Sequence, residues 1–275
     1  MRDYKGLNEI TRQIRKDIVS MIHASKSGHP GGSLSAVEIL TALYFDEMNI
    51  DPNNCKMEDR DRFVLSKGHA APVLYATLAN KGYFDREELK GLRKTGRMLQ
   101  GHPDMKGTPG VDMSTGSLGQ GFSVACGMAM ASKLDNAPWR VYALLGDGEV
   151  QEGIIWEAAM SAAHYKLDNM VAFLDYNGLQ IDGPNEKVMN IGPIVEKFKA
   201  FGWNVIEIDG HDFDQIFAAL DMAKETVGKP TMIIAKTIKG KGISFMENEA
   251  SWHGTAPSDS DLERSLFELG GLDNE

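Results

Sequence analysis

Short apolar segments alternate with helix-length segments along the chain. Val141–Leu145 and Met170–Leu174 are apolar runs closed by turn residues, and a helix-length segment around Trp156–Lys166 separates them. This order predicts two parallel strands joined by a crossover helix. Similar apolar runs predict three further strands, at Phe63–Leu65, Val205–Ile208 and Met232–Ala235.

The segments between these strands carry helical signals. Leucine, isoleucine and methionine recur at helical spacing in Leu7–Ala24, which predicts an amphipathic N-terminal helix. Ser35 followed by Glu38 predicts a capping box that starts a helix through Phe45. Further helices are expected from about Pro72, over Gly121–Leu134 and over Phe213–Glu225. The pattern predicts an α/β fold with a doubly wound, mostly parallel sheet flanked by helices.

Polar residues follow four of the predicted strands. They are His69, Asp147, Asn177 and Lys236. Any one of them could be a turn or cap residue. Ligands of open α/β sheets bind outside the carboxyl ends of the strands, so four such residues together favour a functional site.

Two of these residues have the chemistry of a metal site. Asp147 lies in the sequence Gly-Asp-Gly-Glu, residues 146–149, and Asn177 closes the following strand. Carboxylate and amide oxygens suit a hard divalent cation, and bound Mg²⁺ usually completes its shell with water and phosphate oxygens. The sequence therefore predicts a metal–phosphate site. Zinc is disfavoured, because no HExxH motif or close Cys/His cluster occurs.

A glycine-rich loop, residues 115–121, leads directly into the helix at Gly121–Leu134. Its backbone N–H groups can approach an anion, and the helix N-terminus adds a favourable dipole. It could equally be a flexible connector. The GxGxxG order of a dinucleotide site and the GxxxxGK[ST] order of a P-loop are both absent.

Four of the seven histidines lie in loops rich in glycine or proline, namely His29, His69, His102 and His253. Histidine in such a loop can exchange protons near neutral pH, and it can also serve only as a hydrogen-bonding turn residue. His23 and His164 fall on expected helices, where packing or surface roles are expected. His211 lies in a loop and stays ambiguous.

Composition narrows the function classes. The chain has 275 residues and a net charge of −10, which argues against nucleic-acid or anionic-membrane binding. Its apolar runs are too short for a membrane span, and the charged N-terminus lacks the apolar stretch of a signal peptide. Cys55 and Cys126 are far apart, so reduced thiols and a cytoplasmic location are expected.

Taken together, these motifs resemble the N-terminal, diphosphate-binding domain of transketolase, a thiamine-diphosphate enzyme. The resemblance runs from residue 25 to residue 256. It is carried by the strings SKSGHPGG, FVLSKGHAAP, QGHPDMKGTPGVDMSTGSLGQG, LLGDGEVQEGIIWEAA, DYNGLQIDG, KTIKGKG and WHGTAP. The GDG-to-Asn pairing is general to thiamine-diphosphate enzymes, whereas the GHP and KGH loops point to the transketolase branch.

The resemblance implies a role for each matching residue. Asp147, Asn177 and the carbonyl of Leu179 would hold Mg²⁺, or another divalent cation such as Ca²⁺. The cofactor-binding residues it implies are His69, Gly116, Ser117, Leu118, Gly148, Glu149, Asn177 and His253. The catalytic residues it implies are His29, His102 and His253, which would face the sugar and move protons.

Two segments depart from the family pattern. Ser117 stands where the loop commonly has proline, so the fixed φ of proline is lost. Residues 239–251 also differ from the usual single-chain form, which bears on substrate contacts near His253.

The resemblance also implies an incomplete site. We expect residues 1–275 to form one diphosphate-binding domain with an N-terminal helical region, without the pyrimidine-binding and C-terminal domains. The cofactor-activating glutamate of the family belongs to that missing half. The expected partner is a C-terminal transketolase subunit in an α2β2 heterotetramer, although a truncated chain would look the same.

The expected function is transfer of a two-carbon ketol unit from a ketose phosphate to an aldose phosphate in the cytoplasm. Xylulose 5-phosphate and the pentose phosphate pathway are the default, and specialised sugar pathways are the alternative. Two other functions remain open at this point. The chain could be a subunit of a thiamine-dependent 2-oxo-acid decarboxylase or dehydrogenase, or a non-catalytic phosphate–metal binding module.

Overall fold

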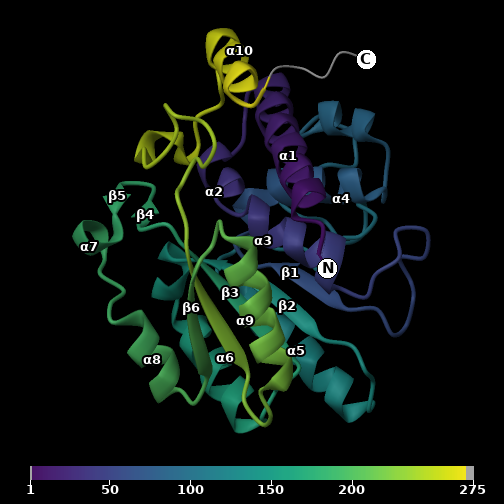
Figure 1. The fold of residues 1–275 in the computed structure, drawn as a ribbon, viewed down its shortest axis with the longest axis vertical. Coiled ribbons are helices and arrows are strands. Elements are labelled where there is room, and N and C mark those ends of the chain that lie inside the picture. The colour runs from purple at the N-terminus through teal and green to yellow at the C-terminus, as the bar shows by residue number, and fades with distance from the viewer. Residues whose placement is uncertain (1, 271–275) are drawn as a thin grey trace.

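A five-stranded parallel sheet forms the centre of the protein, in the strand order β1-β2-β3-β7-β6 (Figure 1). The structure is a computed structural model that describes residues 2–270. Every predicted strand is confirmed, with bounds that differ by at most two residues at either end. The strands are β1 (Arg62–Leu65), β2 (Val141–Gly146), β3 (Met170–Tyr176), β6 (Asn204–Asp209) and β7 (Thr231–Lys236).

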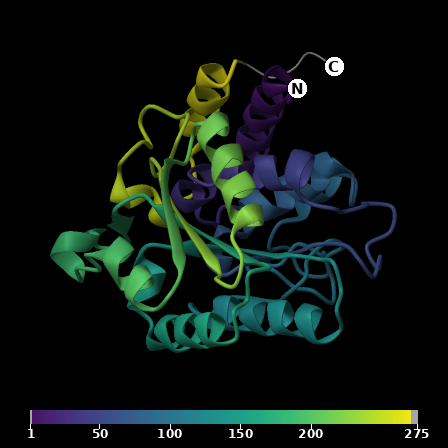
Figure 2. The same ribbon diagram turned by 60° about the horizontal axis from the view of Figure 1, so that its bottom comes forward.

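Helices cover both faces of this sheet, which confirms the doubly wound α/β class (Figure 2). One face packs against α1 (Tyr4–Ser25), α3 (Val37–Ala42), α4 (Ala71–Lys81) and α9 (Phe213–Glu225). The other face packs against α5 (Gln120–Leu134), α6 (Gly153–His164) and α8 (Ile194–Ala200). The remaining α-helices are α2 (Pro30–Leu34), α7 (Asn185–Val188) and α10 (Asp259–Glu268).

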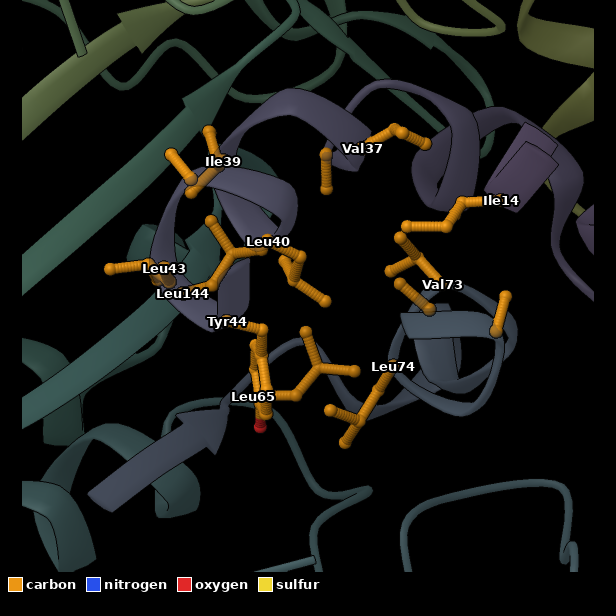
Figure 3. Close-up of a cluster of buried hydrophobic side chains, with 14 of the residues drawn as sticks. Ile14, Val37, Ile39, Leu40, Leu43, Tyr44, Leu65, Val73, Leu74 and Leu144 are labelled. Carbon is orange, nitrogen blue, oxygen red and sulfur yellow. The ribbon is translucent and has the colours of Figure 1, made fainter. Parts of the chain in front are cut away.

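Successive side chains of each strand enter the two cores alternately. In β3, Val171 and Phe173 belong to the core beneath α1 and α9, whereas Ala172 and Leu174 belong to the core beneath α5 and α6. The buried strand is apolar throughout because both of its faces are covered. Figure 3 shows the first of these cores, where Leu65 and Leu144 of the sheet lie near Leu40 and Leu74.

The expected capping box at Ser35 is wrong. Ser35 ends α2, and α3 begins after Ala36 without a side-chain cap. The Ser35 hydroxyl instead donates to the buried carboxylate of Asp175, at 2.6 Å. Glu38 pairs with Arg15 and His211 rather than with a helix terminus. A buried acceptor elsewhere in the fold thus overrides the local capping pattern.

Several short elements carry no sequence signal. The hairpin of β4 (Leu179–Gln180) and β5 (Gly183–Pro184) has two residues in each strand, too few for a detectable period. The helix α2 begins with Pro30 followed by two glycines, which are poor helix formers. None of the helices between residues 2 and 270 is both long enough and apolar enough to cross a membrane.

Candidate functional site

A cavity of about 350 Å³ opens at the carboxyl ends of the central strands. The loops after β1, β2, β3 and β7 line it, together with the glycine-rich loop before α5. Its walls include predicted residues from each of these segments, namely His29, His69, Gly116, Leu118, Asp147, Gly148, Glu149, Asn177, Leu179 and His253. The strand ends therefore bring together most of the predicted site, as the fold class requires.

Asp147 lies at the centre of this cavity and is almost completely buried. Its Oδ1 accepts a hydrogen bond from the Gly148 amide at 2.8 Å, and its Oδ2 accepts one from the Gly178 amide. Burial, together with the nearby Asp175 carboxylate, raises the pKa of Asp147 to about 6. A buried carboxylate held by backbone donors and short of a positive partner is suited to receive a cation.

The other two predicted metal ligands lie on the same side of the cavity. Asn177 Oδ1 accepts from the Leu179 amide at 3.1 Å, and its Nδ2 lies 3.3 Å from Asp175 Oδ2. The carbonyl of Leu179 accepts from Lys239 Nζ at 3.2 Å. Within residues 2–270, no group of three or more His, Cys, Asp or Glu side chains is arranged to hold a metal ion. Asp147, Asn177 and Leu179 thus form an all-oxygen donor set of mixed type.

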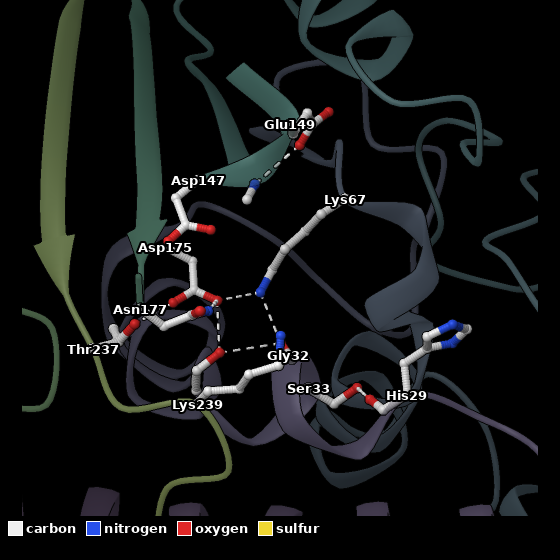
Figure 4. A network of polar contacts seen from close by, with 12 residues as sticks. His29, Gly32, Ser33, Lys67, Asp147, Glu149, Asp175, Asn177, Thr237 and Lys239 are labelled. Carbon is white, nitrogen blue, oxygen red and sulfur yellow. Dashed lines mark hydrogen bonds and ion pairs between the residues drawn. The ribbon is translucent and has the colours of Figure 1, made fainter. Parts of the chain in front are cut away.

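A buried ion pair forms the floor of the cavity. The Lys67 ammonium donates to Asp175 and to the Gly32 carbonyl, and Asp175 also accepts from Ser35 and Thr237 (Figure 4). Burial would raise the pKa of Asp175, but the adjacent Lys67 ammonium and these hydroxyl donors hold it below its ordinary value. The carboxylate therefore stays charged and fixes the Asn177 amide from below.

Three of the predicted histidines form a triangle above the acidic groups. Ring centroids lie 5.3 Å apart for His29 and His69, 5.5 Å for His29 and His253, and 5.2 Å for His69 and His253. Burial and neighbouring cations lower the pKa of His29 to about 4 and that of His253 to about 3, and that of His69 falls well below its ordinary value. All three rings are therefore neutral near pH 7.

Predicted residues His102 and Ser117 lie outside this cavity wall, and both are exposed. A Cβ added to Gly116 would approach the His102 ring to 3.4 Å, so His102 flanks the glycine loop. Gly121 is required here for a different reason, because a Cβ there would lie 2.8 Å from the Ser66 backbone. The loop can therefore reach the end of β1 only with glycine at this position.

Glu149 supports the glycine loop from behind. Its carboxylate accepts from the Ser66 hydroxyl, from the Gly119 amide at 2.8 Å and from the Gly146 amide at 3.0 Å. The side chain is buried, and burial raises its pKa. Its acceptor capacity is used by the protein itself, so its geometry suits positioning of the loop rather than the direct cofactor contact expected from the sequence.

The expectation that Lys236 joins the site is wrong. Lys236 is the last residue of β7, but its side chain is exposed and lies 3.3 Å from Glu207. The buried cation at this end of the sheet is Lys239, whose Nζ lies 3.0 Å from His253 Nδ1. Sequence reasoning also missed Lys67 and Asp175. Asp175 lies in β3 just beyond the apolar run that predicts this strand, and lysines in glycine-rich loops resemble ordinary surface residues.

A buried carboxylate, an amide and a carbonyl lie beside two buried lysines and three neutral histidines. This combination defines the protein as an α/β domain with a site for a metal-bound, phosphorylated ligand. Comparison with known proteins agrees. The family described as "Transketolase, thiamine diphosphate binding domain" matches residues 7–274.

Relatives with established names fall into two size classes. The 6-deoxy-6-sulfo-D-fructose transketolase subunit SqwG of Clostridium sp. (strain MSTE9) is 50% identical over 256 residues, covering 93% of each chain. One of the named subunits of the apulose-4-phosphate transketolase of Phocaeicola vulgatus is 45% identical, over 93% of this chain and 90% of that one. Human transketolase is 44% identical, over 91% of this chain but only 40% of its own length.

Solved structures show the same relationship. The transketolase of Campylobacter jejuni superposes with a TM-score of 0.93 at 34% identity, over all of this chain and 44% of that one. The Leishmania mexicana enzyme gives a TM-score of 0.92 at 31% identity, over 98% of this chain and 42% of that one. The present chain belongs to the transketolase family and corresponds to an N-terminal, thiamine-diphosphate-binding transketolase subunit.

Proposed function

We propose that this chain is the diphosphate- and Mg²⁺-binding subunit of a transketolase that is active with a second polypeptide. The complex would transfer a two-carbon ketol unit from a ketose phosphate to an aldose phosphate. The observation that carries this proposal is the triangle of neutral histidines beside the Asp147, Asn177 and Leu179 donor set. Relatives of the same length are named as subunits, which supports the dependence on a partner.

The residues present fit a metal-bound diphosphate. Asp147, Asn177 and the Leu179 carbonyl would hold Mg²⁺, which prefers oxygen ligands. Lys239 is buried beside them and would offset the negative charge of the phosphates. His29 Nδ1 is buried without a hydrogen-bond partner in the protein. Such an atom calls for a polar ligand group, because an unsatisfied buried nitrogen costs about 1–3 kcal/mol.

Thiamine diphosphate, when bound, supplies the carbon centre that carries the transferred unit. The histidines of this chain would act on the sugar. A neutral imidazole can donate one hydrogen bond and accept another, which suits the adjacent hydroxyls of a polyol. A diphosphate would also raise the low pKa values of His29 and His253, since an opposite charge favours the protonated ring. Proton exchange with substrate hydroxyls then becomes accessible near neutral pH, and His102 would join from the edge of the site.

The donor sugar is the finer question. Xylulose 5-phosphate is the default of the family, while two relatives of similar length are named for 6-deoxy-6-sulfo-D-fructose and apulose 4-phosphate. We infer that the phosphate- or sulfonate-bearing end of the sugar is recognised largely by the partner, because the histidines here address hydroxyl groups. A split enzyme could then change its sugar specificity without altering this site.

A binding and turnover experiment tests the proposal. The chain, alone and as the complex purified from its source, is titrated with thiamine diphosphate and Mg²⁺, and ketol transfer is then assayed with the three ketoses. The proposal expects tight cofactor binding and turnover only in the complex. A complex that binds no thiamine diphosphate, or that transfers no ketol unit from any of the three ketoses, would contradict it.

A further inference from the structure

A second buried charge cluster lies behind the site, between α1, α3 and the loop after β6. Arg15 Nη2 contacts both carboxylate oxygens of Glu38, at 2.7 and 2.9 Å. His211 Nδ1 lies 2.9 Å from Glu38 Oε2. The side chains of Arg15 and Glu38 are each less than a tenth exposed. Burying an arginine, a carboxylate and a histidine together is costly unless each is paired, so the cluster calls for a role.

Both partners of Glu38 also bind the backbone of one segment, residues 238–241. The Ile238 amide donates to His211 Nε2 at 2.9 Å, and Arg15 Nε donates to the Lys241 carbonyl at 2.9 Å. Because Ile238 is a donor, His211 Nε2 must be unprotonated in this arrangement, and Nδ1 carries the proton that bonds Glu38. Glu38 therefore fixes the tautomer of His211 and the orientation of Arg15.

The clamped segment carries the buried cation of the site. Lys239 lies between Ile238 and Lys241, and its ammonium group reaches Leu179 and His253 across the cavity. The Gly240 amide adds a third anchor, since it donates to the Gly31 carbonyl at 3.0 Å. Close approach is built in, because a Cβ on Gly242 would lie 2.9 Å from the Arg15 side chain.

We propose that Glu38, Arg15 and His211 are positioning residues that hold the 238–241 segment so that Lys239 reaches the ligand cavity. This deepens the proposed function and rests on it for the identity of the ligand. The cluster contributes no atom to the cavity wall itself. It acts through the backbone of a segment whose side chain at position 239 meets the ligand, so its loss should weaken anion binding without altering Asp147 or Asn177.

A double-mutant cycle tests this coupling, with Mg²⁺ and inorganic pyrophosphate as the probe. Affinity of the full chain is measured by calorimetry for wild type, His211→Phe, Lys239→Met and the double variant. His211→Phe removes the acceptor of the Ile238 amide and should weaken binding roughly tenfold, the value of one hydrogen bond to a charged group. In the Lys239→Met background the same change should have almost no effect, since the residue through which it acts is gone.

A ligand-free readout separates this proposal from the proposed function. In a crystal structure of His211→Phe, Lys239 Nζ should have left the Leu179 carbonyl, while His211→Gln, which keeps an acceptor near the Nε2 position, should preserve the contact. His164→Phe, at the exposed end of α6, is the matched control. If His211→Phe does not fold, His211→Ala makes the same comparison without added bulk.

Lys239 in its wild-type position in both His211 variants that lack the acceptor would overturn the clamp. Equal losses of affinity in the wild-type and Lys239→Met backgrounds would overturn it as well. Failure of wild type to bind pyrophosphate would instead count against the diphosphate site, and the crystallographic comparison would still decide the role of the cluster.

Discussion

The imidazole ring of His69 stacks on that of His253, with centroids 5.2 Å apart and an interplanar angle of 30°. His69 follows the first strand of the sheet, whereas His253 belongs to the loop that precedes the last helix. Two charged rings at this separation would repel each other. Burial and the nearby lysines Lys67 and Lys239 lower the pKa of both rings, so the neutral forms stack over the site.

These low pKa values predict a loss of stability in mild acid. The unfolded chain protonates His29 and His253 near pH 6.5, whereas the folded chain does so only near pH 4 and pH 3. The unfolded state therefore binds more protons between these limits, and the free energy of unfolding should fall as the pH is lowered from 6.5 to 4. Urea denaturation at pH 7, 6 and 5 measures this slope.

The variant His253→Gln should show a shallower slope than wild type, because glutamine cannot take up the proton. His164→Gln, an exposed substitution at the end of α6, should leave the slope unchanged. Identical slopes for wild type and His253→Gln would show that the ring is not held neutral by its surroundings.

Asp147 predicts how Mg²⁺ binding depends on pH. Its pKa is raised to about 6, and a metal ligand must be deprotonated. Affinity for Mg²⁺ should therefore rise about tenfold for each pH unit below 6 and level off above it, with a proton released on binding at pH 5.5. Calorimetry in buffers of different ionisation enthalpy measures both quantities.

Asp147→Asn should abolish this Mg²⁺ binding, while Asp135→Asn at the exposed end of α5 should not. Mg²⁺ affinity that stays constant between pH 5 and 7 would remove Asp147 from the metal site.

His102 predicts a separation of turnover from cofactor affinity. It lies beside Gly116 and outside the cavity wall, and burial lowers its pKa, with Arg93 contributing. In the assembled enzyme His102→Ala should reduce ketol transfer by at least roughly tenfold, as expected for loss of a proton-exchanging group. Thiamine diphosphate affinity should change less than about twofold. Steady-state kinetics and calorimetry on the same preparation compare the two, and equal losses would contradict a sugar-facing role.

Glu149 predicts a stability effect rather than a binding effect. Replacing it by alanine leaves the buried amides of Gly119 and Gly146 without an acceptor. Each such loss costs about 1–3 kcal/mol, so the free energy of unfolding of Glu149→Ala should fall by about 3 kcal/mol. Glu157→Ala, exposed on α6, should stay within about 0.5 kcal/mol of wild type in urea denaturation. A Glu149→Ala protein of wild-type stability would disprove its supporting role.

The sequence predicts the sheet and its crossover helices well, because strands buried on both faces are apolar throughout. It also predicts that Asp147 and Asn177 meet, since parallel strands end at one edge. Ser35 shows where local patterns fail. Its spacing to Glu38 matches a capping box, yet each side chain binds a buried partner distant in sequence. Lys239 is invisible for the same reason, because only the folded loop brings its ammonium group to His253.

The central claim is that this chain supplies half of a two-chain, thiamine-dependent transketolase site. Native mass spectrometry of the protein purified from its own source, with Mg²⁺ and thiamine diphosphate present, tests it most directly. The account predicts a second polypeptide in equal copy number, with the cofactor retained in an assembly of two copies of each chain. A self-assembly that contains no second polypeptide would contradict it.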